Sequence, residues 1–211
     1  MWTADVCSNH FWALIEQSLQ VSTAKDERVA FLKARLAQES TENIAAIMVC
    51  LDDHKERLNT WDMYGAFWYL FQVGSMDSFS AFQSWLVGLG RSKYESLAAG
   101  ADNVTELSEI RGILEARTAT EARDPRGVTL FELREPDFSE LDSLVYHAYI
   151  RSGGKEDALD DLYAVAEVAY SAVQPVGEEW DISDIDEVRR RLPRTYEYMT
   201  RLRQRYRPTE A

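Results

Sequence analysis

The few residues that could carry out chemistry stand apart in the sequence. Asp52-Asp53-His54 is the one place where acidic residues adjoin a histidine. Metal ligands on a helix favour spacings of three or four, because adjacent residues point to different faces. Glu16 from another helix could complete a metal site, but we interpret Asp52-Asp53-His54 as a solvated helix end. We expect no bound metal and no cofactor.

A second candidate, Gly88-Leu89-Gly90-Arg91, is glycine-rich enough to suggest a phosphate-binding loop. It lacks the third glycine of a dinucleotide fingerprint and the Gly-Lys-Ser/Thr of a P-loop. The apolar residues that precede it follow helical spacing, at Phe79, Phe82 and Leu86. Ser75 or Asp77 can cap such a helix at its start, and a left-handed glycine can end it. We therefore expect a helix end here and no phosphate site.

Nucleophilic catalysis has no local signature in this chain. There is no Gly-x-Ser-x-Gly elbow, and Cys7 and Cys50 lack the pattern of a catalytic thiol. Two cysteines without metal-ligand spacing are typical of reduced thiols in a cytoplasmic protein. Acid pairs such as Asp160-Asp161 carry little information, because an acidic chain contains many. The sequence leaves open whether the protein is an enzyme.

Aromatic residues beside charged ones are the better candidates for a small-molecule site. Trp61 stands next to Asp62 at an expected helix start, and Trp180 stands between two acids in an expected loop. We interpret Trp68 and Trp85, at helical spacings, as core residues. We predict that a ligand pocket would draw on Trp61, Asp62, Asp77, Arg91 and Trp180. A largest pocket that gathers two or more polar side chains from different helices would favour a small enzyme or ligand-binding protein over a protein that acts through protein contacts.

Helices must position these residues, because most of the chain follows helical periodicity. With 211 residues and 45% hydrophobic content, the chain can bury a core as one domain. We predict an all-α fold, a single-domain orthogonal helical bundle over residues 1–211. A short strand or irregular insertion near 124–136, around VTLFEL, is the expected exception, and an isolated ribbon of this length is marginal.

Capping residues predict where the helices begin. We expect starts at Ser8 or Asn9, at Ser40 or Thr41, at Thr60 and at Thr105. Further helices are expected over 139–151, over 156–173 and behind Pro193. The segment after Thr60 is apolar around most of its circumference, so we place that helix at the centre of the bundle.

The net charge of −13 is unevenly distributed along the chain. Residues 189–207 carry +7, so the remainder carries −20. An acidic chain repels nucleic-acid backbones, and we expect no DNA partner. The longest apolar run, IAAIMVCL, is too short to span a bilayer, and the first residues lack a signal-peptide pattern. We therefore expect a cytoplasmic protein without membrane association.

The last expected helix combines an apolar stripe with arginines that stand off it. The stripe consists of Tyr196, Met199, Leu202 and Tyr206. We interpret Arg194, Arg201 and Arg205 as a solvated basic face against an acidic body. The sharper alternative is a docking arm for an acidic partner or RNA. In either case the stripe should supply most of the energy that holds this helix on the body, because exposed ion pairs contribute only about 0–1 kcal/mol.

Six fragments, in the same order, resemble the DUF4240 family of bacterial proteins, which is frequent in actinomycetes. They are HFWALI (10–15), TWDMYGAFWYL (60–70), DSFSAFQSWLVGLGRSKYESL (77–97), AVAEVAY (164–170), PVGEEWDISD (175–184) and RLPRTYEYM (191–199). Gln83 stands where the family usually has an arginine, and Ala101-Asp102 where it tends to have Pro-Asp. An excess of arginine over lysine also suggests a GC-rich bacterial genome.

The resemblance covers most of the chain apart from residues 110–155, which we interpret as divergent or inserted. It implies a helical core over 1–109 that residues 156–211 complete, and it implies no activity. We predict a non-catalytic helical protein that acts through contacts with a protein partner. The alternative is a small enzyme or ligand-binding accessory protein of specialised metabolism, with an aromatic pocket for a small molecule.

Overall fold

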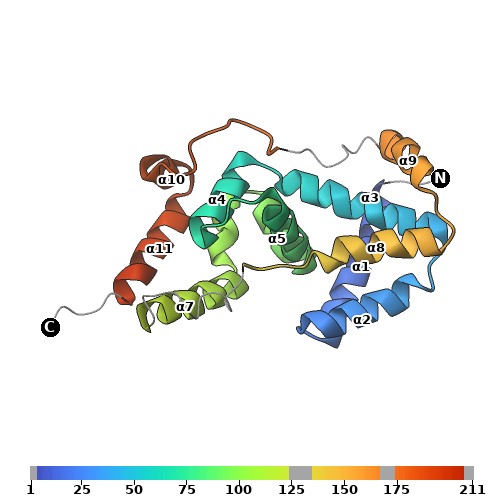
Figure 1. The fold of residues 1–211 in the computed structure, drawn as a ribbon, viewed down its shortest axis with the longest axis horizontal. Helices are drawn as coiled ribbons and strands as arrows, with labels where there is room; N and C mark the ends of the chain where they lie inside the picture. The colour runs from blue at the N-terminus through green and yellow to red at the C-terminus, as the bar shows by residue number, and fades with distance from the viewer. Residues whose placement is uncertain (1–3, 124–134, 167–173, 207–211) are drawn as a thin grey trace.

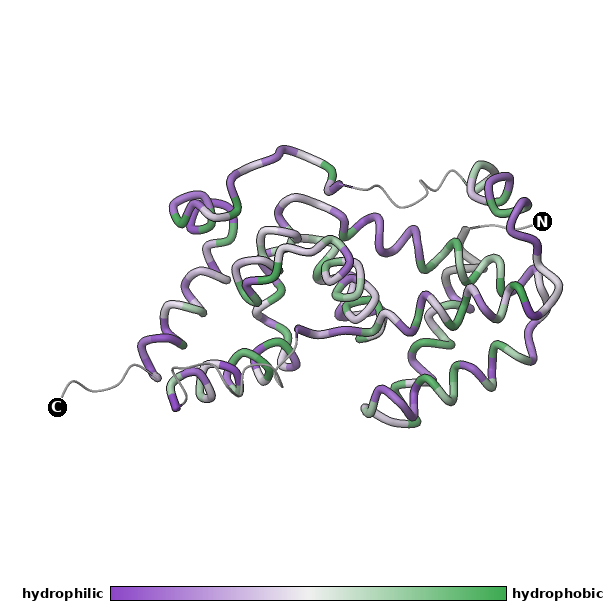
Figure 2. Tube along the Cα trace, in the orientation of Figure 1, coloured by the Kyte–Doolittle hydropathy of each residue, from purple (hydrophilic) through white to green (hydrophobic). Residues whose placement is uncertain are grey.

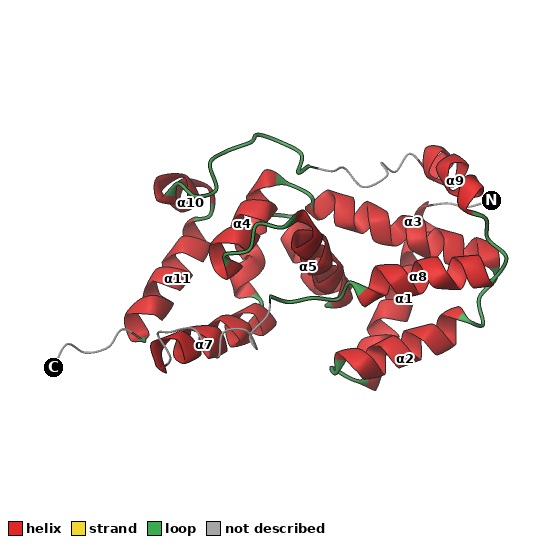
Figure 3. Ribbon diagram, viewed as in Figure 1, coloured by secondary structure: helices red, strands yellow, loops and turns green. Residues whose placement is uncertain are grey.

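Helices make up the described part of the chain. The computed structural model describes residues 4–123, 135–166 and 174–206 (Figures 1 and 3). The α-helices are α1 (Ala4–Val21), α2 (Lys25–Leu36), α3 (Thr41–Leu58), α4 (Trp61–Phe71), α5 (Met76–Gly88), α6 (Arg91–Ala98), α7 (Ser108–Arg123), α8 (Glu140–Arg151), α9 (Leu159–Ala166), α10 (Ile185–Arg191) and α11 (Pro193–Arg205). The 3₁₀ helices are η1 (Ala101–Glu106) and η3 (Glu156–Ala158). No β-strand occurs within these described ranges, and the predicted all-α fold is confirmed.

Three of the predicted capping residues begin helices. Ser40 caps α3, Thr60 caps α4 and Ser75 caps α5. In each case the side-chain oxygen accepts a hydrogen bond from the backbone N–H three residues later, at 3.2 or 3.3 Å. Each bond satisfies one of the backbone donors that the first turn of a helix leaves free.

Two other predicted helix starts were wrong. α1 begins at Ala4, ahead of the predicted caps Ser8 and Asn9. Thr105 lies inside η1 and is 2% exposed, and α7 begins three residues later. Its neighbour Val104 is fully buried, so this part of the chain packs inward instead of presenting a capping side chain.

Between residues 110 and 173, the described helices lie close to the predicted ranges. α7 continues to Arg123, and α8 occupies the range expected for it. VTLFEL, predicted as a short strand or irregular insertion, lies outside the described residues. The helix predicted over 156–173 divides into η3 and α9, and residues 167–173 lie outside the described part.

One helix, α10, was not predicted. Asp184 caps it by accepting a hydrogen bond from the backbone N–H of Asp186 at 2.9 Å. Acids occupy its first turn and Arg189, Arg190 and Arg191 its last, which complements the helix dipole. At seven residues the helix is too short for apolar periodicity to reveal it, although its capping and charge signals are present in the sequence.

The glycine segment between α5 and α6 is a helix end, as predicted. Gly88 is the last residue of α5, and Gly90 has a φ of +95°, which glycine adopts at little steric cost. Arg28 donates a hydrogen bond to the carbonyl oxygen of Gly88 at 2.7 Å and lies over the ring of Phe138. Burial lowers the pKa of Arg28 to about 10. A buried side chain from α2 therefore satisfies the carbonyl at the end of α5.

Helices α4 and α5 lie in the middle of the molecule. Figure 1 shows α1, α2, α3 and α8 on one side of them and α7, α10 and α11 on the other. Phe67 of α4 stacks on Phe82 of α5 with ring centroids 4.9 Å apart, and both rings are fully buried. One cluster of buried apolar side chains extends from Phe11 in α1 to Leu202 in α11. The aromatic helix α4 thus belongs to the core, as its apolar circumference predicted.

Candidate functional site

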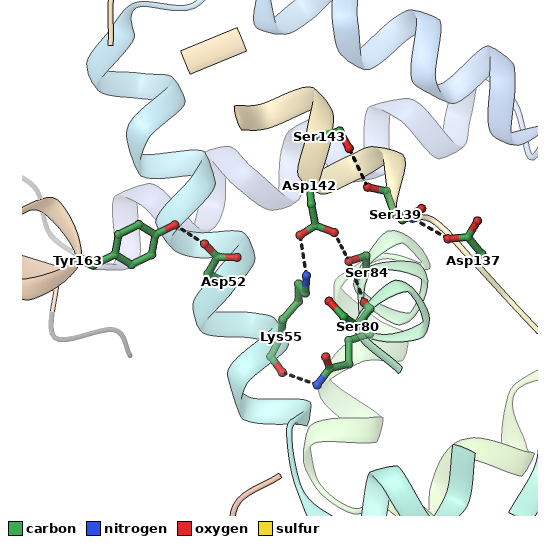
Figure 4. Close-up of polar contacts among 10 residues, drawn as sticks. Asp52, Lys55, Ser80, Ser84, Asp137, Ser139, Asp142, Ser143 and Tyr163 are labelled. Atoms are coloured by element: carbon green, nitrogen blue, oxygen red, sulfur yellow. Dashed lines mark hydrogen bonds and ion pairs between the residues drawn. The ribbon is translucent and has the colours of Figure 1, made fainter. Parts of the chain in front are cut away.

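The acidic cluster at the end of α3 divides between two environments. Asp52 points towards α9, where the hydroxyl of Tyr163 donates a hydrogen bond to it (Figure 4). Burial raises the pKa of Asp52 above its usual range. Asp53 pairs with Arg57 on the surface at 2.7 Å. The prediction of a solvated helix end is therefore wrong for Asp52, which lies in an interface between helices.

His54 is buried among aromatic rings. It is 6% exposed, and its ring centroid lies 4.7 Å from that of Trp12 and 4.8 Å from that of Tyr94. Its Nδ1 lies 3.2 Å from the hydroxyl oxygen of Tyr94. Burial lowers the pKa of His54 to about 4, so the imidazole is neutral at neutral pH. The sequence contained the signal for this burial, because His54 continues the apolar stripe formed by Leu51 and Leu58.

A second set of polar side chains joins α3, α5 and α8. The Lys55 ammonium pairs with Asp142 at 2.6 Å, and Asp142 also accepts a hydrogen bond from the hydroxyl of Ser84 at 2.6 Å (Figure 4). Gln83 donates to the backbone carbonyl of Lys55 at 3.2 Å. These groups use one another as hydrogen-bond partners, so we interpret the cluster as polar packing between helices. Within the described ranges, no three His, Cys, Asp or Glu side chains are grouped so that they could hold a metal ion.

The first pocket, of about 330 Å³, lies at the corner between α3 and α4 and is called the corner pocket here. Trp61 and Asp62 line it, together with Arg57 of α3 and Arg191 of α10. Segment 176–178 closes one side, because Val176 exchanges backbone hydrogen bonds with the turn that starts α4. The structure thus places two of the predicted ligand-binding residues in one pocket.

Arg191 is the charged centre of the corner pocket. Its side chain is 12% exposed and contacts Glu178 at 2.7 Å, Glu187 at 3.1 Å and Asp62 at 3.5 Å. The hydrogen bond that Arg191 donates to Glu178 is the main cause that raises the pKa of Arg191. The ion pairs therefore hold Arg191 in the charged state.

Trp180 was predicted to be partly exposed, and this prediction was wrong. Its side chain is buried, and the guanidinium of Arg191 lies 5.5 Å from its ring. The ring fits against α4 where Gly65 has no side chain. A Cβ atom at Gly65 would lie 2.3 Å from Cζ2 of Trp180, well inside van der Waals contact. The slot at Gly65 is the physical reason that a loop tryptophan between two acids can be buried.

The other two predicted ligand-binding residues lie elsewhere. Asp77 is exposed in the first turn of α5, where a carboxylate complements the helix dipole. Arg91 pairs with Glu95 at 2.7 Å and donates a hydrogen bond to Asn9 at 3.1 Å. Neither side chain lines the corner pocket.

A second and larger pocket was missed by sequence reasoning. This groove, of about 430 Å³, lies between α4 and α11 and is called the tyrosine groove here. Its lining residues are Tyr69, Ile185, Tyr196, Thr200, Arg203 and Gln204. Tyr69 and Tyr196 come from helices far apart in the sequence and stack with ring centroids 6.5 Å apart. Both pockets gather polar side chains from different helices, which is the observation that favours a ligand-binding role.

The three arginines predicted to bind a partner are exposed and paired with acids of the same chain. Arg194 contacts Glu106 at 2.7 Å, Arg201 contacts Glu197, and Arg205 contacts Glu115 at 3.4 Å. Figure 2 shows hydrophilic residues predominating along α10 and α11. Exposed pairs of this kind contribute about 0–1 kcal/mol each, so a partner can exchange them at little cost.

Two further arginines, Arg189 and Arg203, contact rings instead of acids. The guanidinium of Arg189 lies 5.9 Å from the ring centroid of Tyr196, and that of Arg203 lies 5.4 Å from the ring centroid of Tyr69. Within the described part of the chain neither has a carboxylate within 4.0 Å. Sequence reasoning did not separate these two from the other tail arginines, because Arg194 and Arg205 also pair with no acid of their own helix and contact acids of other helices.

Comparison with known proteins identifies the family. The family model described as a protein of unknown function (DUF4240) matches residues 7–171. The match runs through residues 110–155, and it ends before the last two of the six fragments that suggested the resemblance. Searches of curated proteins and of solved structures gave no match. In the described ranges, no helix combines the length and the apolarity needed to cross a membrane. The chain belongs to the DUF4240 family.

Proposed function

We propose that this DUF4240 protein is a non-catalytic binding protein that contacts a protein partner through α10, α11 and the adjoining edge of α4. The observation that carries the proposal concerns two exposed arginines, Arg189 and Arg203. They lie over tyrosine rings beside the tyrosine groove, and neither pairs with an acid of the described chain. Cationic and aromatic groups on one surface form the chemical pattern that protein interfaces favour.

Two further properties support a surface that binds. Ile185, at the edge of the tyrosine groove, is 48% exposed, so an apolar side chain is accessible to a partner beside the tyrosines. The +7 charge of residues 189–207 against −20 elsewhere would orient an acidic partner towards this end of the molecule.

Two of the pocket residues, Tyr69 and Arg191, are poorly suited to acid–base catalysis at neutral pH. General acids and bases work best when their pKa lies near the operating pH. Burial raises the pKa of Tyr69 in the tyrosine groove, and Glu178 raises the pKa of Arg191 in the corner pocket. Neither group changes its charge near neutral pH.

Cross-linking followed by affinity purification from native lysate tests the proposal. We expect the wild-type chain to capture a defined protein, and the double variant Arg201→Glu/Arg205→Glu to capture at least about tenfold less of it, because like charges across an interface repel. The matched control is Lys33→Glu/Arg151→Glu, which makes the same charge change on exposed positions of α2 and α8. Equal capture by the two variants, or a chain that stays alone in every fraction, contradicts the proposal.

A second candidate function is small-molecule binding in the corner pocket, as in an accessory protein or small enzyme of metabolism. It is favoured by Arg57, Asp62 and Arg191, which converge there from three helices beside Trp61. Metabolite panels read by thermal shift test it, with Asp62→Asn as the variant and Asp77→Asn as the control at an exposed acid outside the pocket. A ligand that stabilises wild type and control but not Asp62→Asn would establish this site.

A further inference from the structure

The tyrosine groove could accommodate one large side chain of a partner. Its floor is Tyr69, which is 4% exposed, and Tyr196 stacks on it from α11. Tyr196, Thr200 and Arg203 follow at spacings of four and three, so they share one face of α11. Ile185 forms the rim on the α10 side. The groove thus offers an apolar, aromatic surface with hydroxyl and amide groups along one edge.

The charges at the groove differ from those elsewhere on the tail. The other described arginines between 189 and 205 all pair with carboxylates: Arg190, Arg191, Arg194, Arg201 and Arg205. Arg189 and Arg203 alone among the described arginines of this segment are without one, although the chain has 36 acidic residues. Their guanidinium groups rest on the two tyrosines that form the groove. Arg189 and Arg203, which pair with no carboxylate of the described chain, therefore lie beside the two tyrosines of the groove.

We propose that the tyrosine groove binds an acidic peptide segment of the partner protein. A large apolar or aromatic side chain of the peptide packs on Tyr196 and Ile185, above the buried Tyr69, and its flanking carboxylates pair with Arg189 and Arg203. Arginine forms such bidentate pairs with carboxylates while its face still stacks on an aromatic ring. This inference rests on the proposed function, and it adds where the partner docks and what chemistry it presents.

Charge also decides between a peptide and a nucleic acid as the occupant. A single-stranded RNA could stack bases on tyrosines and pair its phosphates with arginines. Its backbone would continue beyond the groove, over a body that carries −20. A peptide with a few carboxylates can confine its negative charge to the two arginines, so the peptide is the occupant that the charge distribution favours.

Fluorescence anisotropy with synthetic probes tests the inference on the full chain. The test probe is a labelled peptide with a central tryptophan and two glutamates on each side. One control peptide carries alanine in place of the tryptophan, and the other carries lysines in place of the glutamates. We expect the acidic tryptophan peptide to bind, and both control peptides to bind at least about tenfold more weakly. An oligouridine of similar length is the third comparison, and tighter binding of the RNA would overturn the peptide inference.

Two double variants separate the groove from the general charge of the tail. Arg189→Gln/Arg203→Gln should weaken the acidic peptide by about tenfold or more, the effect of losing about 1.4 kcal/mol. Arg201→Gln/Arg205→Gln removes the same charge from acid-paired positions and should change affinity by about twofold or less. All four side chains are exposed, so both variants are expected to fold, and circular dichroism checks this.

Equal weakening by the two variants, or no binding of the acidic tryptophan peptide, overturns the inference. The proposed function fails separately. If native lysate yields a partner whose capture depends on Arg201 and Arg205 while the peptide does not bind, only the acidic-peptide inference is lost. If the peptide binds but native lysate yields no partner, the groove chemistry stands and the role in protein contacts is lost.

Discussion

Helices α4 and α11 are of similar length but are held in the molecule in different ways. α4 buries eight of its 11 residues, whereas α11 buries three of its 13. The centre is therefore stabilised by packing on all sides, and the C-terminal helix by one apolar stripe with charged contacts around it. Substitutions on the outer face of α11 should therefore leave the stability of the core unchanged, because distant sites contribute independently.

The largest effect should come from the centre. Phe67→Ala removes a fully buried ring that stacks on Phe82 and also contacts Phe71 and Phe79. We expect a loss of about 3–5 kcal/mol in the free energy of unfolding, measured by denaturant titration. Phe31→Ala makes the same truncation at a half-buried position of α2 and should cost clearly less. Similar losses at both positions would show that the centre is not the better-packed region.

The next effect is a pH dependence confined to the buried end of α3. His54 has a pKa of about 4 in the folded protein and near 6.5 when unfolded, so the unfolded chain binds the proton first as pH falls. The free energy of unfolding that neutral, buried His54 contributes is fully present above pH 6.5 and is lost as pH falls from 6.5 to 4. The difference of about 2.5 pKa units corresponds to about 3 kcal/mol.

Denaturant titrations at several pH values, on wild type and on His54→Phe, measure this effect. The variant keeps an aromatic ring among Phe11, Trp12 and Tyr94 but cannot be protonated. Wild type should lose about 3 kcal/mol more than the variant between pH 7 and pH 4. Parallel curves for wild type and His54→Phe would mean that His54 is protonated without opening the core.

Local signals predicted the centre well and failed where distant elements decide. Ser40, Thr60 and Ser75 were found because a helix cap depends on residues three positions apart. Trp180 was misjudged because its slot is the missing side chain of Gly65, 115 positions earlier. No pattern around Trp180 records that contact, so burial could not be derived from the loop sequence.

The same reason limits what the sequence says about the candidate sites. Trp61 and Asp62 were found because they sit at a recognisable helix start, and both line the corner pocket. The tyrosine groove was missed because Tyr69 and Tyr196 each look like core residues on their own helices. The stacking of these two rings, and the position of Arg203 over Tyr69, arise only when α4 and α11 meet.

On α11 itself, the apolar stripe should matter more than the charges. Leu202 is 2% exposed, and Leu202→Ala should cost about 2 kcal/mol, at the lower end for such truncations because the helix packs on one side. Hydrogen exchange of the α11 amides measures the loss. The charge control, Arg201→Gln/Arg205→Gln, should cost about 0–1 kcal/mol for each pair. The reverse ranking, or strong salt sensitivity of wild-type exchange in α11, would show that charge holds this helix.

The smallest effect concerns how α11 begins. Its first residue, Pro193, has no N–H, and the next two backbone N–H groups, of Arg194 and Thr195, both donate to the carboxylate of Asp102 in η1, at 2.9 and 2.8 Å. Asp102 thus caps the helix from outside, and Asp102→Ala should cost about 1 kcal/mol, as for a lost N-cap.

The matched control for this cap is Glu106→Gln, which removes the ion-pair partner of Arg194 and leaves the Asp102 cap in place. Hydrogen exchange in the first turn of α11 should rise for Asp102→Ala and change little for Glu106→Gln. Asp102 lies within the range that the family model matches and α11 lies beyond it. If removing the cap leaves exchange in α11 unchanged, the Leu202 stripe and the pairs of Arg194 with Glu106 and of Arg205 with Glu115 suffice to join the two parts. If it loosens the first turn, a single carboxylate of the matched region fixes the direction in which α11 leaves the body.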